Sequence, residues 1–208
     1  MLEPRIQQQF YDTADLLVQL AEPLARPLAA AAEAAVATLT AGGKLLMAGT
    51  GSAQVDALHA AALLVGRSER ERPALSALAL GADSGTLMGL LPAGGDVAAA
   101  LARQIQALGL PGDALVLFEG HSATGRAEDS KTLLPLIEAA HARDMSVILW
   151  HGCAREAAPS PELLALLSET DVLLTVQADR LSARSLLYRL GWHAVVEAID
   201  MQLLGETE

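Results

Sequence analysis

The chain has 208 residues, of which 52% are apolar and 3% aromatic, and its formal net charge is −11. A chain of this size can bury one substantial core, and the scarcity of aromatic residues indicates a core of Leu, Ala and Val with closely packed helices. The negative charge excludes nonspecific binding of nucleic acid, whose phosphates it would repel, so any link to DNA would run through another protein.

The compartment follows from two absences in the sequence. Cys153 is the one cysteine, which excludes an internal disulfide and fits a reducing environment. The first ten residues lack the apolar centre of a signal peptide, and no apolar run approaches the roughly 20 residues of a membrane span. We therefore expect a cytoplasmic protein that is not embedded in a membrane.

The N-terminal part of the chain predicts two helices. Apolar residues recur at helical spacing over Ile6–Leu20, and Pro23 and Pro27 then interrupt the pattern. An Ala-rich helix is predicted over Leu28–Thr40. These helices carry more apolar surface than one sheet layer can cover, so residues 1–41 are expected to serve in oligomerisation.

Beyond residue 41, apolar runs of strand length alternate with helical patterns. Alternation of this kind predicts a parallel sheet covered by helices on both faces, a three-layer α/β/α sandwich over residues 42–208. The predicted strands are 44–48, 74–80, 114–118, 146–150 and 172–176, and the predicted helices are 53–65, 95–107, 130–143, 161–167 and 182–204.

The first of these strands is followed by Gly49-Thr50-Gly51-Ser52 and then directly by a helical pattern. A strand, a Gly-rich turn and a helix N-terminus form an anion site, because free N–H groups and hydroxyls meet there and glycine lets a ligand approach the backbone. The turn would lie at the carboxyl edge of the sheet, where such folds bind ligands. A Gly-x-Gly tripeptide is a weak motif when it stands alone.

Longer stretches carry a family resemblance. GTGSAQVDALH (49–59), ERPALSALAL (71–80), RQIQALGLPGDALVLF (103–118) and EAAHARDMSVILWHG (138–152) occur in that order. Together they resemble the sugar isomerase (SIS) domain family, in the branch that contains phosphoheptose isomerase and the DnaA initiator-associating protein. The resemblance implies a single flavodoxin-like domain over residues 1–208, with five parallel strands, assembled as a homotetramer.

The resemblance also implies where an isomerase would keep its catalytic groups. The family serine that grips phosphate falls on Ala53, with Ser52 one place early. His59 matches a histidine that is a metal ligand in zinc-containing members, but the glutamate four residues later falls on Leu63. The histidine of the C-terminal helix aligns with Tyr188. Aldose–ketose isomerisation needs a base and an acid, so we expect no catalytic residues, metal or cofactor, and a packed or hydrogen-bonded His59.

A second sugar-phosphate loop of the family aligns with Glu119–Ser130, which is longer and more acidic here. Hydroxyl groups remain available in it as phosphate donors, whereas the charge of Glu119 would oppose phosphate. The alternating charges of Glu69–Arg72 are expected to form a solvated connection. The predicted substrate-binding residues are Gly49, Thr50, Gly51, Ser52, His59, Ser122, Thr124 and Ser130.

Two functions follow from the resemblance. The first is a noncatalytic phosphosugar-binding regulator that promotes replication initiation by binding DnaA; the ending Asp200–Leu204 aligns with the Asp-x-x-Leu-Phe ending of that type, with Leu203 and Leu204 as partner-binding residues. The alternative is a divergent phosphoheptose isomerase acting on sedoheptulose 7-phosphate, or a sugar-phosphate sensor. The altered positions at Leu63 and Tyr188 favour the first.

Overall fold

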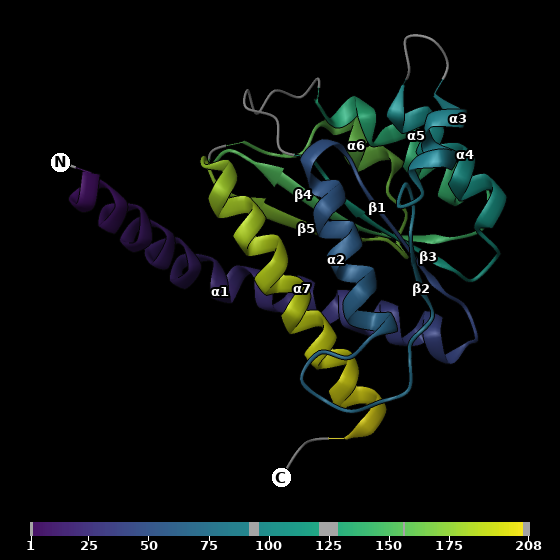
Figure 1. Cartoon of the computed structure of the whole chain (residues 1–208), viewed down its shortest axis with the longest axis horizontal. Coiled ribbons are helices and arrows are strands. Elements are labelled where there is room, and N and C mark those ends of the chain that lie inside the picture. The colour runs from purple at the N-terminus through teal and green to yellow at the C-terminus, as the bar shows by residue number, and fades with distance from the viewer. Residues whose placement is uncertain (1, 92–95, 121–128, 156, 206–208) are drawn as a thin grey trace.

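The computed structural model describes residues 2–91, 96–120, 129–155 and 157–205 of the chain. Its centre is a five-stranded sheet, parallel throughout, in the order β2-β1-β3-β4-β5 (Figure 1). This confirms the predicted α/β class and the parallel sheet. The strands are β1 (Leu45–Gly49), β2 (Ala77–Ala79), β3 (Ala114–Phe118), β4 (Ser146–Cys153) and β5 (Val172–Gln177).

Helices cover both faces of this sheet because side chains alternate along each strand. In β3, Val116 and Phe118 point to the core beneath α1 (Leu2–Thr40), α2 (Gln54–Val65) and α7 (Leu181–Leu204). Leu115 and Leu117 point to the core beneath the opposite helices, α4 (Val97–Leu108), α5 (Leu134–His141) and α6 (Pro161–Leu166). Short helices are η1 (Gly51–Ala53), α3 (Ser84–Leu90) and η2 (Asp129–Thr132).

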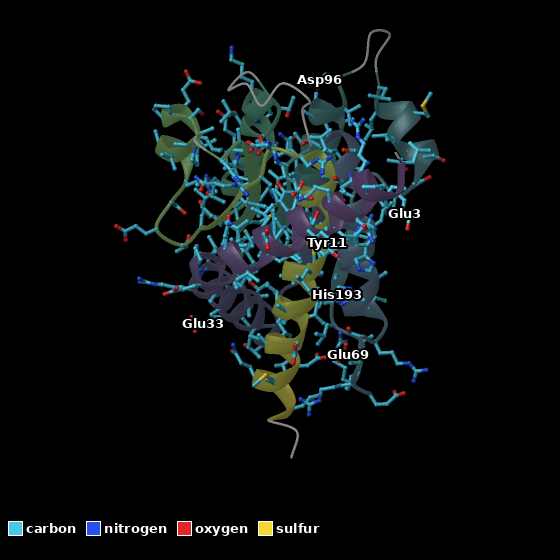
Figure 2. The ribbon with its side chains drawn as sticks, turned by 90° about the vertical axis from the view of Figure 1, so that its left-hand side faces the viewer. Glu3, Tyr11, Glu33, Glu69, Asp96 and His193 are labelled. Atoms are coloured by element: carbon cyan, nitrogen blue, oxygen red, sulfur yellow. The ribbon has the colours of Figure 1, made fainter. Side chains whose placement is uncertain are left out.

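The prediction of two N-terminal helices was wrong, because α1 is one helix of 39 residues that contains Pro23 and Pro27. Each proline removes one backbone N–H, a local cost. Packing compensates for it, since Leu16 before the prolines, Leu24 between them and Ala31 after them are buried in the core. The first turns of α1 extend beyond the sheet as an arm (Figure 1), and Figure 2 shows Tyr11 of this arm on the same side of the molecule as His193 of α7.

Several boundaries differ from the expected ones. β2 is only three residues long and pairs with β1 alone, at the edge of the sheet. The helix α3 was not predicted; it begins where the Asp83 carboxylate accepts the Gly85 N–H. Strand β4 extends to Cys153, which places His151 inside the strand. None of the helices in the described ranges combines the length and the apolar content that crossing a membrane requires.

An aromatic cluster fixes α7 on the sheet. Phe118 of β3 stacks on Trp150 of β4 with ring centroids 5.6 Å apart, and Trp192 meets both rings edge-on. Gly191 permits the close approach, because a Cβ at this position would lie 2.8 Å from the Trp150 ring. The rotation of α7 about its axis is thereby set, and with it the residues that α7 presents to α2.

Candidate functional site

The turn after β1 has the predicted strand–turn–helix geometry. Gly51 has a φ of +53°, and a Cβ on Gly49 would lie 2.3 Å from the Ala53 carbonyl oxygen, so both positions require glycine. Gln54 braces the turn: its Oε1 accepts the Gly49 N–H at 3.1 Å and its Nε2 donates to the Leu80 carbonyl at 2.5 Å. Through Gln54, the turn is therefore tied to the ends of β1 and β2.

A second contact joins this turn to the end of β3. The Gly120 N–H donates to Thr50 Oγ1 at 2.6 Å, and the Thr50 N–H donates to the Phe118 carbonyl at 3.0 Å. Within the described ranges, no hydrogen bond is made by the N–H groups of Gly51 and Ser52, and both residues are exposed. These two groups and the Ser52 hydroxyl are what the turn offers to an anion.

The position aligned with the family's phosphate serine serves packing instead. Ala53 is completely buried in the core beneath α2. Of the second predicted loop, Ser122 and Thr124 lie outside the described residues, and Ser130 lies in η2, where the structure describes only its backbone. The structure thus brings Gly49–Ser52 together with Gly120 and leaves the rest of that loop an expectation.

At the carboxyl ends of β3 and β4, Glu119 and His151 form a buried pair. His151 Nδ1 lies 2.5 Å from Glu119 Oε2, which also accepts the Gly152 N–H. Burial alone would lower the pKa of His151, but the hydrogen bonds to Cys153 and Glu119 and the carboxylate charge outweigh it and raise the pKa to about 9. At neutral pH the imidazolium compensates the Glu119 charge, so the expected repulsion of phosphate is offset.

The histidine that meets His59 is His193, and Tyr188, the residue aligned with the family's C-terminal histidine, bonds to the sheet. His59 of α2 and His193 of α7 approach with their Nε2 atoms 3.2 Å apart. Tyr188 is fully buried and its hydroxyl donates to the Trp150 carbonyl at 3.1 Å. Burial, followed by the Glu119 charge, raises the pKa of Tyr188 well above its usual range, so this phenol stays protonated.

One helical turn before the histidines, a buried carboxylate holds an arginine. Asp56 Oδ1 lies 2.9 Å from Arg189 Nε; the Asp56 side chain is 4% exposed and that of Arg189 is 47% exposed. Burial lowers the pKa of His59, and the nearby His193 and Arg189 lower it further, against a smaller opposite effect of Asp56. His59 is therefore neutral at pH 7 and able to accept a proton.

The site does not fit the zinc of the zinc-containing family members. Two imidazole nitrogens 3.2 Å apart could share a cation, but catalytic zinc sites use three protein ligands. Leu63, which occupies the expected place of the carboxylate, is half-buried and packs against the core. Over the part of the chain that the structure describes, no group of three His, Cys, Asp or Glu side chains could hold a metal.

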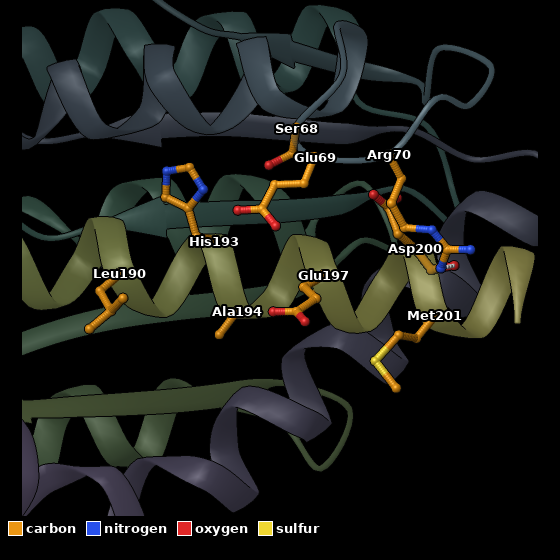
Figure 3. A pocket seen from close by; sticks show the side chains of 9 residues that line it. All are labelled: Ser68, Glu69, Arg70, Leu190, His193, Ala194, Glu197, Asp200 and Met201. Atoms are coloured by element: carbon orange, nitrogen blue, oxygen red, sulfur yellow. Dashed lines mark hydrogen bonds between the residues drawn. The ribbon is translucent and has the colours of Figure 1, made fainter. Parts of the chain in front are cut away.

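A cavity of about 520 Å³ lies beside His193, between α7 and the loop that follows α2. Figure 3 shows the carboxylate of Glu69, carried by that loop, reaching over α7 between His193 and Glu197. The lining of this cavity includes Glu69, Arg70 and Glu197. Arg189 lies beside Asp56 in the first turn of α2, at the opposite end of that helix.

The sequence predicts that the charged run Glu69–Arg72 is a solvated connection, but in the structure one of its residues is buried. Arg72 is buried: its Nε lies 2.6 Å from Asp200 Oδ1, and its terminal nitrogens donate to the carbonyls of Leu63 and Leu64 at 2.8 Å. These carbonyls belong to the last turn of α2, where helical partners are missing. Arg72 therefore ties α2 to α7.

Sequence reasoning missed His193, Arg189 and Asp56. A signal was present, because Arg189 and His193 are four residues apart on one helix, and Asp56 and His59 are three apart on another. Which faces of the two helices meet depends on contacts between residues more than 130 positions apart, as for His59 and His193. The pattern within either helix could not supply that information.

Comparison with known proteins gives consistent results. The SIS domain family matches residues 9–150. The phosphoheptose isomerase of Methylibium petroleiphilum is 41% identical over 208 residues, covering 100% of this chain and 98% of the relative, and that of Azoarcus sp. is 36% identical over 98% of both. Solved phosphoheptose isomerases from Neisseria gonorrhoeae (TM-score 0.80, 30% identity, 96% and 99% coverage) and Francisella tularensis (0.84, 29%, 97% and 99%) have the same fold.

Proposed function

The chain belongs to the SIS domain family, and on that basis we propose that it is a metal-independent isomerase of a seven-carbon sugar phosphate, such as sedoheptulose 7-phosphate. The observation that carries the proposal is the contact between His59 and His193. This contact supports the proposal because it offers two imidazoles for proton transfer, whereas the family's glutamate and histidine fall on Leu63 and Tyr188.

In this proposal the phosphate binds at the turn after β1. The N–H groups of Gly51 and Ser52 and the Ser52 hydroxyl would donate to it, assisted by the positive end of the α2 dipole. His59 lies seven residues beyond Ser52, which is about 10 Å along the helix axis at 1.5 Å per residue. An extended seven-carbon chain with a terminal phosphate spans this length, so its carbonyl end would reach the histidine pair.

Proton transfer is then assigned to the pair. His59, neutral at pH 7, is suited to take a proton from the carbon next to the carbonyl and to return it to the neighbouring carbon. His193, in contact with His59, is suited to move the hydroxyl proton between the two oxygens. The polar cavity beside His193 would receive water or the substrate hydroxyl groups.

The DnaA-binding role predicted from the sequence gains no support from these findings. In the ending aligned with the DnaA-binding type, Asp200 is buried in its pair with Arg72 and Leu203 packs against the core, so both have structural roles. Leu204 is 44% exposed. The relatives described above carry the isomerase name, and the DnaA role stays a prediction.

The test follows turnover of sedoheptulose 7-phosphate by the full chain in D₂O, with NMR detection of the aldose product and of deuterium incorporated next to the carbonyl. His59→Ala and His193→Ala are each expected to lower kcat by about 10²–10⁴. His141→Gln, which removes a histidine outside the site, should leave kcat unchanged.

Absence of turnover and exchange in the wild-type chain would overturn the isomerase proposal. In that case the melting temperature separates the remaining possibilities, because a ligand at 100 times its Kd adds about 2.7 kcal/mol of stability. A rise with sedoheptulose 7-phosphate would indicate a sensor. No rise would leave the site without a sugar-phosphate ligand.

A further inference from the structure

Isomerisation through an enediolate places negative charge on the former carbonyl oxygen. Enzymes stabilise such charge with fixed donors, cations or metal ions aimed at the oxygen. The described residues of this site provide no metal-binding group of three ligands. A cationic side chain that borders the histidine pair is suited to this role.

Arg189 has that position and is held there. It precedes His193 by four residues on α7, and its partner Asp56 precedes His59 by three residues on α2, so the ion pair and the histidine pair form successive contacts across the same two helices. Asp56 is buried and engages Nε. Among the described residues nothing accepts from the Arg189 Nη groups, and the side chain is about half exposed.

We propose that Arg189 is a catalytic residue that binds the oxygen on which negative charge develops. This inference rests on the proposed isomerase function. Asp56 is then a positioning residue, because its buried carboxylate fixes the guanidinium through Nε and leaves the Nη donors for the substrate.

The step balances without a co-reactant. The C–H bond next to the carbonyl breaks, the proton passes to His59, and the electron pair forms the C=C bond of the enediolate. The carbonyl π electrons move to oxygen, which accepts N–H bonds from Arg189. The proton then returns to the former carbonyl carbon, the hydroxyl oxygen of the neighbouring carbon becomes the new carbonyl, and its proton passes through His193 to the other oxygen.

The order of groups along α2 assigns Arg189 to this oxygen and not to the phosphate. The turn that offers N–H donors precedes the helix, Asp56 lies in its first turn, and His59 lies one turn further on. Arg189 therefore lies between the anion-binding turn and the histidines along the axis of α2.

The experiment compares Arg189→Ala with Arg180→Ala. Arg180 is an arginine of similar exposure that lies near Asp12, away from the histidine pair. Loss of an oxyanion donor is expected to lower kcat for sedoheptulose 7-phosphate by about 10²–10³ with little change in KM. Millimolar guanidinium should restore part of the kcat of R189A. It should leave the activity of R180A unchanged. Arg189→Lys should be intermediate, since it keeps the charge and loses the fork.

Unchanged kcat in R189A would overturn the inference, and so would a rise in KM with kcat retained, which would mark a phosphate-binding arginine. Because R189A leaves Asp56 buried without its partner, the double variant D56N/R189A is measured beside it and should show the same loss of kcat and the same rescue. If the wild-type chain has no turnover, the isomerase proposal fails separately from this inference. Binding of a hydroxamate analogue of the enediolate is then measured. Loss of binding in R189A with retention in R180A supports Arg189 as the anion-binding group, and equal binding in the two variants overturns it.

Discussion

Arg72 and Asp200 form an ion pair whose side chains are 2% and 3% exposed, with Arg72 Nε 2.6 Å from Asp200 Oδ1. The pair connects the segment after α2 to the last turns of α7, and Arg72 also covers the carbonyls at the end of α2. It therefore holds together the two helices that carry the candidate site.

Replacing Asp200 by Asn should destabilise the fold by about 3–5 kcal/mol, because it leaves a buried guanidinium without its counter-charge. Urea unfolding measures the change. Glu71→Gln is the control, since its partner Arg67 and Glu71 itself are largely exposed and a surface pair contributes little. A D200N variant as stable as E71Q would mean that water reaches Arg72.

Because of the Glu119–His151 pair, we expect the stability of the fold to decrease at alkaline pH. The pKa of His151 in the folded chain is about 9, above the usual 6.5, so its contribution is fully present below pH 6.5 and is lost as pH rises through 9. Urea midpoints between pH 6 and 10 should fall over this range in the wild-type chain.

Glu119→Gln removes the carboxylate charge and should flatten that dependence, so the difference between the two profiles isolates the pair from other groups that titrate near pH 10. Cys153→Ala provides a second comparison, because the thiol also raises the pKa of His151. Parallel profiles for the wild-type chain and E119Q would show that His151 is neutral in the fold.

Leu63→Glu should create a zinc site. Residue 63 is one turn beyond His59 on the same face of α2, and a carboxylate there would supply the third protein ligand that the described residues lack. Metal analysis after dialysis against zinc should give about one zinc per chain for L63E and none for the wild-type chain. Leu63→Gln, similar in size and uncharged, is the control; stoichiometric zinc in the wild-type chain would contradict the prediction.

The exposed apolar side chains of the α1 arm predict association of chains, as the homotetramer implied by the resemblance requires. Ile6, Phe10 and Val18 are each more than half exposed on this helix. Light scattering on a sizing column should give a tetramer for the wild-type chain and smaller species for Phe10→Glu. Met88→Glu, at an exposed apolar residue of α3, is the control; an unchanged mass for F10E would place the interface elsewhere.

The existence of the strands and of most helices was accessible from the sequence because each depends on local pattern. Strands such as Ala114–Phe118 read as short apolar runs, and Gly49–Ser52 read as a turn between a strand and a helix. The continuation of α1 through Pro23 and Pro27 could not be predicted from the sequence, because it depends on the burial of Leu24 and Ala35 against residues that are distant in the chain. Local propensity alone predicted a break.

Only part of the candidate site could be predicted from the sequence, again because the rest depends on long-range packing. His59 stood out because a motif surrounded it, whereas His193 had no motif and was found only when the packing of Gly191 on Trp150 set the rotation of α7. The acidic character of Glu119 predicts repulsion of phosphate, and nothing in the sequence indicates that His151 of the neighbouring strand pairs with this carboxylate and offsets its charge.

The aromatic cluster has a spectroscopic consequence. Trp150 and Trp192 are the two tryptophans of the chain, their ring centroids are 6.3 Å apart, and both are buried beneath α7. Intrinsic fluorescence therefore reports a single place, the seam between α7 and the sheet, and near-ultraviolet dichroism should carry a coupled signal from the two indoles. Loosening of α4 and α5 on the opposite face would be silent to both signals, whereas any detachment of α7, and with it of His193, would be seen at once.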